Sequence, residues 1–323
     1  MILIASRKND ISTISVIKWL LQKKKAFVLL TEGNEISQLT YNTQGESIIK
    51  FKDRAPVNLE KITSYWYRKG ANRFKAKVPE IESTLSELDR QTKLFIRAET
   101  NSIARYLDYH FQTKRHLNTF EDSTDVNKLI LCDIAHSVGL KTPPSLITDN
   151  KASLLQFFQA HKDIITKPLE IPINYLTNNH WIPMYTEQLT LEMIQDLPDQ
   201  FNLSLFQKKI EKKYELRIFC LEKEKYSMAI FSQRDAQTTV DFRKYNFNKP
   251  NRNVPFRLPP EIDTKIDQFL EASNYKCGSI DMLVDPNDHY YFLEINPVGQ
   301  FGMVSIPCNY NLEKKIAEYL CKK

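Results

Sequence analysis

Glycine is scarce in this sequence: the 323 residues include only 7 glycines, about 2% where roughly 7% is usual. None of the seven is followed by lysine, so the sequence has no G-x-x-x-x-G-K phosphate loop. No G-x-G-x-x-G fingerprint follows the first predicted strand either. These absences exclude the nucleotide-binding folds that rely on a glycine loop. If the protein binds a nucleotide, groups other than a glycine loop must hold it.

Long hydrophobic runs and paired cysteines are also missing. No apolar stretch approaches the roughly 18 residues that a membrane span needs, and the one near the N-terminus is too short for a signal peptide. The 5 cysteines are scattered without a C-x-x-C pair, which is typical of reduced thiols in a cytosolic protein. A net charge of +6 is too mild for a nucleic-acid-binding signature. We therefore expect a cytoplasmic protein that binds neither membranes nor nucleic acid.

The first part of the chain alternates predicted strands and helices. Apolar runs predict strands over 1–5, 26–30, 47–51 and 62–68, and an amphipathic helix is predicted over 11–25. This β-α-β order favours a parallel sheet, and hence a Rossmann-like layer without its glycine fingerprint.

The remainder mixes helices and strands in an α+β order. A long helix is predicted over 81–111, and polar residues near 116–125 indicate a boundary. A second helix over 126–138 ends at Gly139, where a left-handed C-terminal cap is expected. We predict three domains, namely a Rossmann-like domain over 1–115, a central domain over 116–205 and a C-terminal domain over 206–323.

The sharpest local signal is GSIDMLVDPNDHYYFLEINPVGQF, residues 278–301. Its D-P-N-D centre is strong turn chemistry, so the segment predicts a β-hairpin. If Val284 pairs with His289, then Asp281 lies opposite Phe292, on the face that carries Glu294 and Asn296. Two carboxylates and an amide oxygen are hard ligands that suit Mg²⁺.

The alternative is a solvated polar face on an exposed hairpin. Apolar residues flank the acids, namely Ile280, Met282, Leu293 and Ile295, and burying an unpaired carboxylate is costly. A metal is therefore the simpler explanation. The argument depends on register, because a shift of one residue in the turn places Asp281 on the opposite face.

The pattern D-x-L-V…Y-x-F-L-E-I-N-P resembles the metal-binding end of the ATP-grasp ligases, whose fold clamps ATP between two α+β subdomains. Four upstream segments resemble the family's nucleotide-binding parts: N-K-L at the start of the helix ending at Gly139, I-I-T-K-P, F-Q-K-K-I and E-L-R. The resemblance implies ATP and Mg²⁺ as cofactors, with Asp281, Glu294 and Asn296 on the metal. The nucleotide-binding residues that it implies are Lys128, Lys167, Gln207, Lys209, Ile210 and Glu215.

A narrower resemblance is to the graspetide synthetases, the microviridin-type and grasp-with-spasm peptide macrocyclases. It rests on S-Q…D-F-R at 232–243, W-Y-R-K at 66–69 and N-P-V-G-Q at 296–300. It implies an ADP-forming ligase that phosphorylates Asp or Glu side chains of a ribosomally made precursor peptide. Ser or Thr hydroxyls then close ω-ester rings, or Lys closes ω-amides. The implied catalytic residues are Arg217, Asp241 and Arg243, and a homodimer is implied, with the long helix as a contact.

Other interpretations remain open. One alternative is an ATP-grasp ligase of another branch, which adds an amino acid to a protein or a small acid. Another is a non-catalytic ATP-grasp-like protein, or a basic peptide- or RNA-binding module. The lysines between 208 and 213 favour a solvated hinge edge over four ligands. The basic stretch 66–77 suits either a docking surface for an acidic peptide or a loop balanced by nearby acids. The segment 169–181 lacks the glycines of a phosphate-covering loop.

Overall fold

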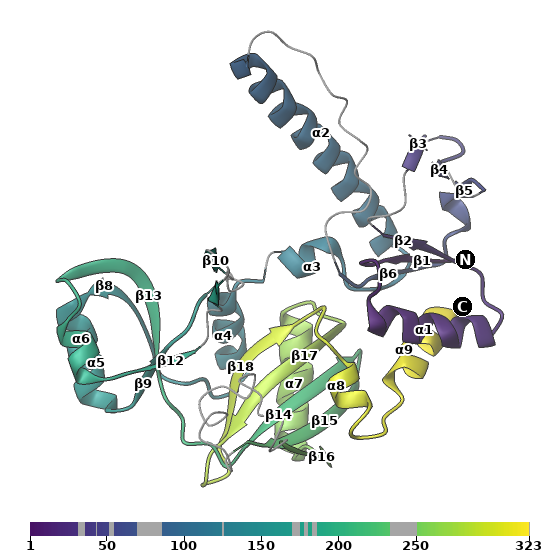
Figure 1. The fold of residues 1–323 in the computed structure, drawn as a ribbon. Helices are drawn as coiled ribbons and strands as arrows, with labels where there is room; N and C mark the ends of the chain where they lie inside the picture. The colour runs from purple at the N-terminus through teal and green to yellow at the C-terminus, as the bar shows by residue number, and fades with distance from the viewer. Residues whose placement is uncertain are drawn as a thin grey trace. The chain divides into compact units, whose positions relative to one another are not determined.

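The computed structural model describes residues 1–31, 36–42, 44–51, 55–69, 86–124, 126–169, 175–177, 180–182, 186–232 and 251–322 (Figure 1). The chain forms two compact units, Met1–Asp125 with Pro297–Lys323, and Val126–Asn296. This grouping differs from the sequence-based division into three consecutive domains. The C-terminal residues join the N-terminal unit, and the boundary predicted at 205/206 falls inside one strand, β13 (Gln200–Lys208).

The first unit contains a fully parallel four-stranded sheet in the order β2-β1-β6-β7. Its strands are β1 (Ile2–Ala5), β2 (Phe27–Leu30), β6 (Ser64–Tyr67) and β7 (Arg115–Leu117). β1 and β6 are buried along their whole length, as parallel strands covered on both faces require. The predicted parallel pairing is therefore present. The predicted strand at 47–51 does not join this sheet.

That strand, β4 (Ile48–Phe51), belongs to a small antiparallel sheet with β3 (Ile36–Thr40) and β5 (Val57–Asn58), followed by a 3-10 turn, Leu59–Lys61. The helices of the first unit are α1 (Ile11–Gln22), α2 (Ser86–Gln112), α3 (Phe120–Thr124), α8 (Gly302–Ser305) and α9 (Leu312–Cys321). The first five residues of the predicted long helix, 81–85, lie outside the described residues.

Helix α9 explains why the C-terminus belongs to the N-terminal unit. Its buried side chains include Ile316 and Leu320. Ser64 Oγ in β6 donates a hydrogen bond to the Leu320 carbonyl at 2.8 Å, and Lys23 pairs with Glu318 at 3.2 Å. Figure 1 shows α9 beside α1.

The second unit contains two larger sheets. One has the order β12-β9-β13-β8 and is built from β8 (Ser145–Asn150), β9 (Ile164–Thr166), β12 (Glu187–Leu189) and β13, with α5 (Lys151–His161) and α6 (Leu191–Gln195). β10 (Tyr175–Thr177) and β11 (His180–Ile182) pair as antiparallel strands and overlap the glycine-free segment 169–181.

The other sheet is antiparallel, in the order β16-β15-β14-β17-β18. Its strands are β14 (Tyr214–Leu221), β15 (Glu224–Phe231), β16 (Arg252–Phe256), β17 (Cys277–Val284) and β18 (Tyr290–Asn296). Two helices complete this part, α4 (Lys128–Ser137) and α7 (Pro260–Ala272). Gly139, with φ +78°, ends the α4 region in the left-handed conformation that was predicted.

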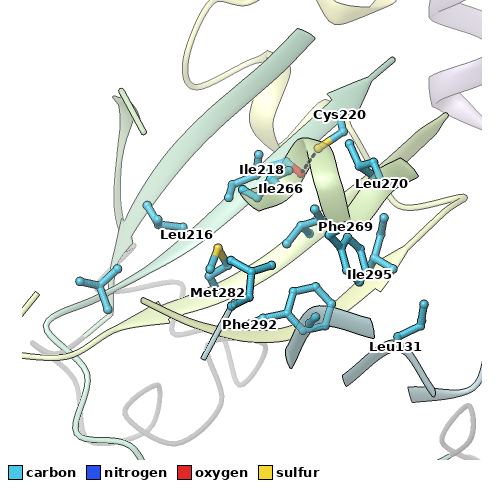
Figure 2. Packing of buried hydrophobic residues seen from close by; sticks show 14 of the residues in the cluster. Leu131, Leu216, Ile218, Cys220, Ile266, Phe269, Leu270, Met282, Phe292 and Ile295 are labelled. Atoms are coloured by element: carbon cyan, nitrogen blue, oxygen red, sulfur yellow. Dashed lines mark hydrogen bonds between the residues drawn. The ribbon is translucent and has the colours of Figure 1, made fainter. Parts of the chain in front are cut away.

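One face of the five-stranded sheet forms one hydrophobic core of the second unit (Figure 2), and a separate cluster that includes Leu154 and Phe206 lies on its other large sheet. Phe269 of α7 stacks at 4.7 Å from Phe292 of β18, and Leu131 of α4 joins the same cluster. The strands contribute alternate residues to this core, including Leu216, Ile218, Ile280 and Met282. Because side chains of a strand alternate between faces, the residues between them point to the opposite face.

All five cysteines are free, in agreement with the predicted absence of a disulfide framework. None of the helices in the described ranges combines the length and hydrophobicity required of a transmembrane segment.

Candidate active site

The β17–β18 hairpin has a different register from the one predicted. Val284 pairs with Tyr290 rather than His289, and Met282 pairs with Phe292. The one-residue shift that threatened the metal prediction is therefore real at the turn. Phe292 consequently faces the hydrophobic core, fully buried, instead of lying between the acids.

A β-bulge restores the predicted meeting of the two carboxylates. Between Asp281 and Met282 the pairing shifts by one residue, so that Leu293 is extra and Asp281 lies directly opposite Glu294. Asn296, two residues further, pairs with Ser279 on the same face. The three predicted metal ligands thus share one face, and Asp281 and Glu294 are direct rather than diagonal partners.

Arg217 of β14 lies on the same face, directly opposite Asp281. Its Nη1 donates a very short charge-assisted hydrogen bond to Asp281 Oδ2. Burial raises the pKa of Asp281 to about 6, the Arg217 charge opposes that rise, and the Glu294 charge adds to it. The Glu294 carboxylate is therefore close enough to influence the protonation of Asp281.

Lys128 begins helix α4 and reaches Glu294. Its Nζ lies 3.6 Å from Glu294 Oε2 and donates to the Pro168 carbonyl at 3.1 Å. Pro168 follows Lys167, the second predicted nucleotide lysine. Both lysines and Glu294 act electrostatically on the thiol of Cys132, whose pKa is raised mainly by burial. Lys128, Lys167 and Glu294 therefore all lie near Cys132 in the second unit.

Glu215, the predicted ribose-binding acid, lies two residues from Arg217 on the same face of β14. It is buried and accepts hydrogen bonds from Lys212 Nζ and, at 3.0 Å, from Ser232 Oγ. Lys212 was predicted to be a solvated hinge lysine, but it is buried and paired with Glu215. The prediction was wrong for Lys212 because the sequence does not show that Glu215, three residues further along the chain, is buried and pairs with it.

The predicted adenine hinge begins at the end of β13, which includes Gln207, and continues to Ile210. Gln207 is buried, and its Nε2 donates to Ser145 Oγ at 2.9 Å. Lys209 Nζ donates a hydrogen bond to Gln188 Oε1 at 2.7 Å, and the Lys209 backbone N–H donates one to the Asp163 carbonyl at 2.9 Å. Within the described residues, the backbone N–H of Ile210 donates to no other backbone group. Of the hinge residues, Ile210 therefore offers a backbone donor to a ligand.

Asp241 and Arg243, two of the three predicted catalytic residues, lie outside the described residues. The structure instead adds residues that the motifs did not indicate. Ser279 lies beside Asn296 on the site face, and Met228 and Leu283 supply apolar surface opposite Arg217 and Glu215. The sequence did contain a signal for Ser279: it lies two residues before Asp281, and side chains two apart on a strand share a face.

The donor set fits a magnesium ion. Two carboxylates and an amide oxygen converge, and two buried polar atoms of the same face, Arg217 Nε and Ser279 Oγ, have no hydrogen-bond partner within the described residues. Such orphaned atoms require a ligand, ion or water. In the described ranges, no cluster of three His, Cys, Asp or Glu side chains capable of holding a metal is present. The site described here contains two carboxylates. That number suits Mg²⁺, because a bound Mg²⁺ would keep its other coordination positions for phosphate oxygens.

No protein-family model matches the chain, and no curated protein matches its sequence. Solved structures do match. A RiPP-associated ATP-grasp ligase from Chryseobacterium gregarium, in complex with ADP and a leader and core peptide, is 23% identical with a TM-score of 0.81, over 99% of this chain and 94% of that one.

Two further structures are similar. The macrocyclase MdnC from Microcystis aeruginosa, bound with precursor peptide MdnA, is 26% identical with a TM-score of 0.77, over 100% of this chain and 99% of that one. The ATP-grasp ligase PsnB, complexed with minimal precursor, Mg and ADP, is 15% identical with a TM-score of 0.72, over 99% and 96%. The mixed α/β fold is therefore that of the ATP-grasp ligases, and the resemblance to their graspetide-type branch is confirmed.

Proposed function

We propose that this chain, with its graspetide-type ATP-grasp fold, is an ATP-dependent macrocyclase of a ribosomally made precursor peptide. The observation that carries the proposal is the likeness to MdnC over essentially the whole of both chains. It is supported by the meeting of Lys128, Asp281 and Glu294, which are far apart in the sequence, at one place in the second unit.

We assign ATP to the face of the five-stranded sheet opposite α7. Lys128 and Lys167 would bind phosphate oxygens as point charges, and Glu215 would accept the ribose hydroxyls. The Ile210 backbone would hydrogen-bond the adenine edge, and Gln207 and Lys209 would hold the hinge in position. Met228 and Leu283 offer the apolar surface that a flat base requires.

Asp281, Glu294 and Asn296 would hold Mg²⁺, which neutralises charge on the phosphates when bound. Both carboxylates already face a cation in this structure, Arg217 and Lys128. The two cations that pair with these carboxylates would therefore also face the negative charge of the triphosphate.

The proposed chemistry proceeds in two steps. An oxygen of a peptide Asp or Glu carboxylate attacks the γ-phosphorus of ATP, the bond to the leaving oxygen breaks, and ADP and an acyl phosphate result. A Ser or Thr hydroxyl then attacks the acyl carbon and loses its proton, and phosphate leaves as the ω-ester closes; a Lys amine gives an ω-amide. Arg217 and Arg243 would hold the phosphoryl group and the carboxylate by bidentate contacts. Asp241 would orient Arg243 or accept the hydroxyl proton.

We further propose that the protein is a cytoplasmic homodimer and that its parallel N-terminal sheet is Rossmann-like. Helix α2 supports the dimer, because Phe95, Ile103 and Tyr109 are each more than half exposed along it. Exposed apolar stripes on a helix are typical of interaction surfaces. A second copy would cover them.

Mass spectrometry of a precursor peptide treated with the protein, ATP and Mg²⁺ tests the proposal. A small acidic peptide, rich in Thr, Ser, Asp and Glu and encoded beside this chain, is the substrate to use. We expect the peptide to lose the mass of one water for each ring, and one ADP to be released for each ring. A mass increase by an amino acid would instead support the ligase that extends a carboxylate, and an unchanged mass with no ADP would contradict both.

A further inference from the structure

The carboxyl ends of the parallel strands in the first unit are covered by the chain itself. In open parallel sheets this edge is where ligands bind, beside the point at which the strand order reverses. Here the order β2-β1-β6-β7 reverses at β1. The residues that follow β6 and β7, Arg68 and Asn118, both contact the segment 297–301. The segment therefore takes the place that a ligand has in such sheets.

Arg68 is the centre of this contact. Only 2% of its surface is exposed. Its Nη1 donates a very short hydrogen bond to the Val298 carbonyl, and its Nη2 donates to Gln300 Oε1 at 3.2 Å. The guanidinium also lies over the Phe301 ring at 5.3 Å. A planar fork that reaches two acceptors fixes direction as well as distance, which a lysine does not.

The charge of Arg68 is balanced inside the same unit. Asp10 Oδ2 lies 3.6 Å from its Nε and also accepts the Thr13 backbone N–H at 2.8 Å as the N-cap of α1. A buried guanidinium with a carboxylate and backbone acceptors is a fixed structural group. Arg68 is therefore not part of an exposed basic docking surface, as its place in the stretch 66–77 had allowed.

Two more side chains hold the same segment. Asn118 Nδ2 donates to the Pro297 carbonyl at 2.8 Å, and Ser12 Oγ donates to Gln300 Oε1 at 3.1 Å. Asn118 has φ +55°, a left-handed backbone conformation. We call Arg68, Asn118 and Ser12, with their bonds to 297–300, the segment clamp.

The segment clamp begins directly after the proposed metal ligands. Asn296 ends β18, and Pro297 is the next residue. β18 is the edge strand of its sheet: β17 pairs with it along its length, and on the outer side Lys141 bridges to Tyr291 and its carbonyl accepts the Phe292 backbone N–H at 2.8 Å, near the start of the strand and away from Asn296. The end of an edge strand frays unless the chain beyond it is fixed. The position of Asn296, and to a lesser degree of Glu294, then depends on how the following residues are held.

We propose that Arg68 and Asn118 are positioning residues for the magnesium–nucleotide site, acting through the segment 297–301 on Asn296 and Glu294. This inference rests on the proposed function, because it assumes that those two residues bind the metal. Groups that orient metal ligands typically change metal affinity about 10- to 100-fold when removed. The segment clamp is expected to act on the metal-dependent part of nucleotide binding alone.

Calorimetric titration of ADP, with and without Mg²⁺, tests the proposal on the full chain. We expect Arg68→Met and Asn118→Gly to raise the half-saturating Mg²⁺ concentration about tenfold, while the affinity for ADP without Mg²⁺ stays within about twofold. Glycine accepts the left-handed conformation of residue 118, so that variant removes only the side-chain donor. Turnover of the precursor should show a higher Mg²⁺ requirement in both variants.

Tyr65→Phe is the matched control, since it removes a buried hydrogen bond to Asp108 in the same unit but leaves the segment clamp intact. An unchanged Mg²⁺ requirement in folded Asn118→Gly overturns the proposal even if Arg68→Met does not fold. An equal shift in Tyr65→Phe also overturns it, because general loosening then explains the result. If wild type binds ADP but never responds to Mg²⁺, the proposed metal site itself fails, and with it this inference.

Discussion

At the scale of single residues, the site is a set of paired opposite charges on one face of a sheet. Arg217 faces Asp281, Lys128 faces Glu294, and Lys212 faces Glu215. Each acid that the motifs assign to ATP or metal thus has a cation beside it. Buried charges need such partners because unpaired ones are costly to desolvate. The pairs keep the site folded, and the same groups are the ones that phosphates and Mg²⁺ would engage.

Glu294→Gln tests the metal assignment. The amide keeps the size of the side chain but removes the charge, so we expect ADP release to fall on the order of 100-fold or more, as when a group that stabilises transition-state charge is lost. A coupled assay for ADP measures it. Asp288→Asn in the turn of the same hairpin is the control and should retain activity, because Asp288 is exposed and pairs with Lys213 at 2.8 Å. Full activity of Glu294→Gln would remove Glu294 from the site.

Asp108 in the first unit provides a test by pH. Burial raises its pKa from 3.8 to about 6, although hydrogen bonds from Tyr65 and the Phe120 backbone lower it. Between these values the folded state keeps a proton that the unfolded state has lost, so the contribution of Asp108 to stability falls as pH rises. One pKa unit corresponds to about 1.4 kcal/mol, so the fall is at most about 3 kcal/mol.

We therefore expect Asp108→Asn to gain stability relative to wild type as pH rises from about 4 to about 6. Urea unfolding across that range measures the difference. Asp122, whose pKa burial also raises, is present in both proteins, so the burial of its carboxyl affects both alike; the variant loses only its charge interaction with Asp108. A constant difference between the two proteins would show that Asp108 does not carry the shift.

At the scale of elements, the N-terminus of helix α4 places Lys128, a proposed nucleotide-binding residue. Asn127 caps the helix, with Oδ1 accepting from the Leu129 and Ile130 backbone N–H groups at 3.0 and 3.3 Å. Lys128 is the first helical residue. The cap that starts the helix therefore also sets the direction of the lysine side chain.

Asn127→Ala should cost about 1 kcal/mol and lower the melting temperature by about 2–4 °C. The KM for ATP should rise, because the first turn that carries Lys128 frays. Asn127→Ser keeps a capping oxygen and should restore both values. An unchanged KM together with a lowered melting temperature would separate the cap from nucleotide binding.

The β17–β18 hairpin shows what an element's sequence leaves open. The turn residues predicted the hairpin correctly, and the motif predicted which acids meet. The bulge at Leu293 could not be predicted, because it depends on Phe292 and Ile295 both packing against α7 while Glu294 faces the other way. That choice is made by a helix outside the hairpin.

At the scale of the whole molecule, the chain returns to its first unit after completing the second. Pro297–Lys323 belongs with Met1–Asp125, and α9 buries Ile316 there while Ile218 is buried in the core of the second unit. The two isoleucines are therefore matched probes of two separate cores.

Ile316→Ala and Ile218→Ala should each cost about 2–5 kcal/mol. Hydrogen exchange should lose protection in β1, β6 and α1 for the first variant, and in β14 and β17 for the second. Loss of protection throughout the chain in both variants would mean that the units unfold together, contrary to their division.

The sequence alone determined the chemistry of this protein: which lysines, acids and arginines are present, where the main turn and several helices lie, and that no glycine loop holds a nucleotide. These are local properties, set by residue type and short-range pattern. The tertiary structure alone decided that a bulge corrects the hairpin register, that Lys212 is buried against Glu215, and that the C-terminal segment covers the parallel sheet. The bulge and the covering segment depend on packing between residues that are distant in the sequence, and the Lys212–Glu215 pair depends on burial by the surrounding fold. The free energy of that packing is not recorded in any local pattern.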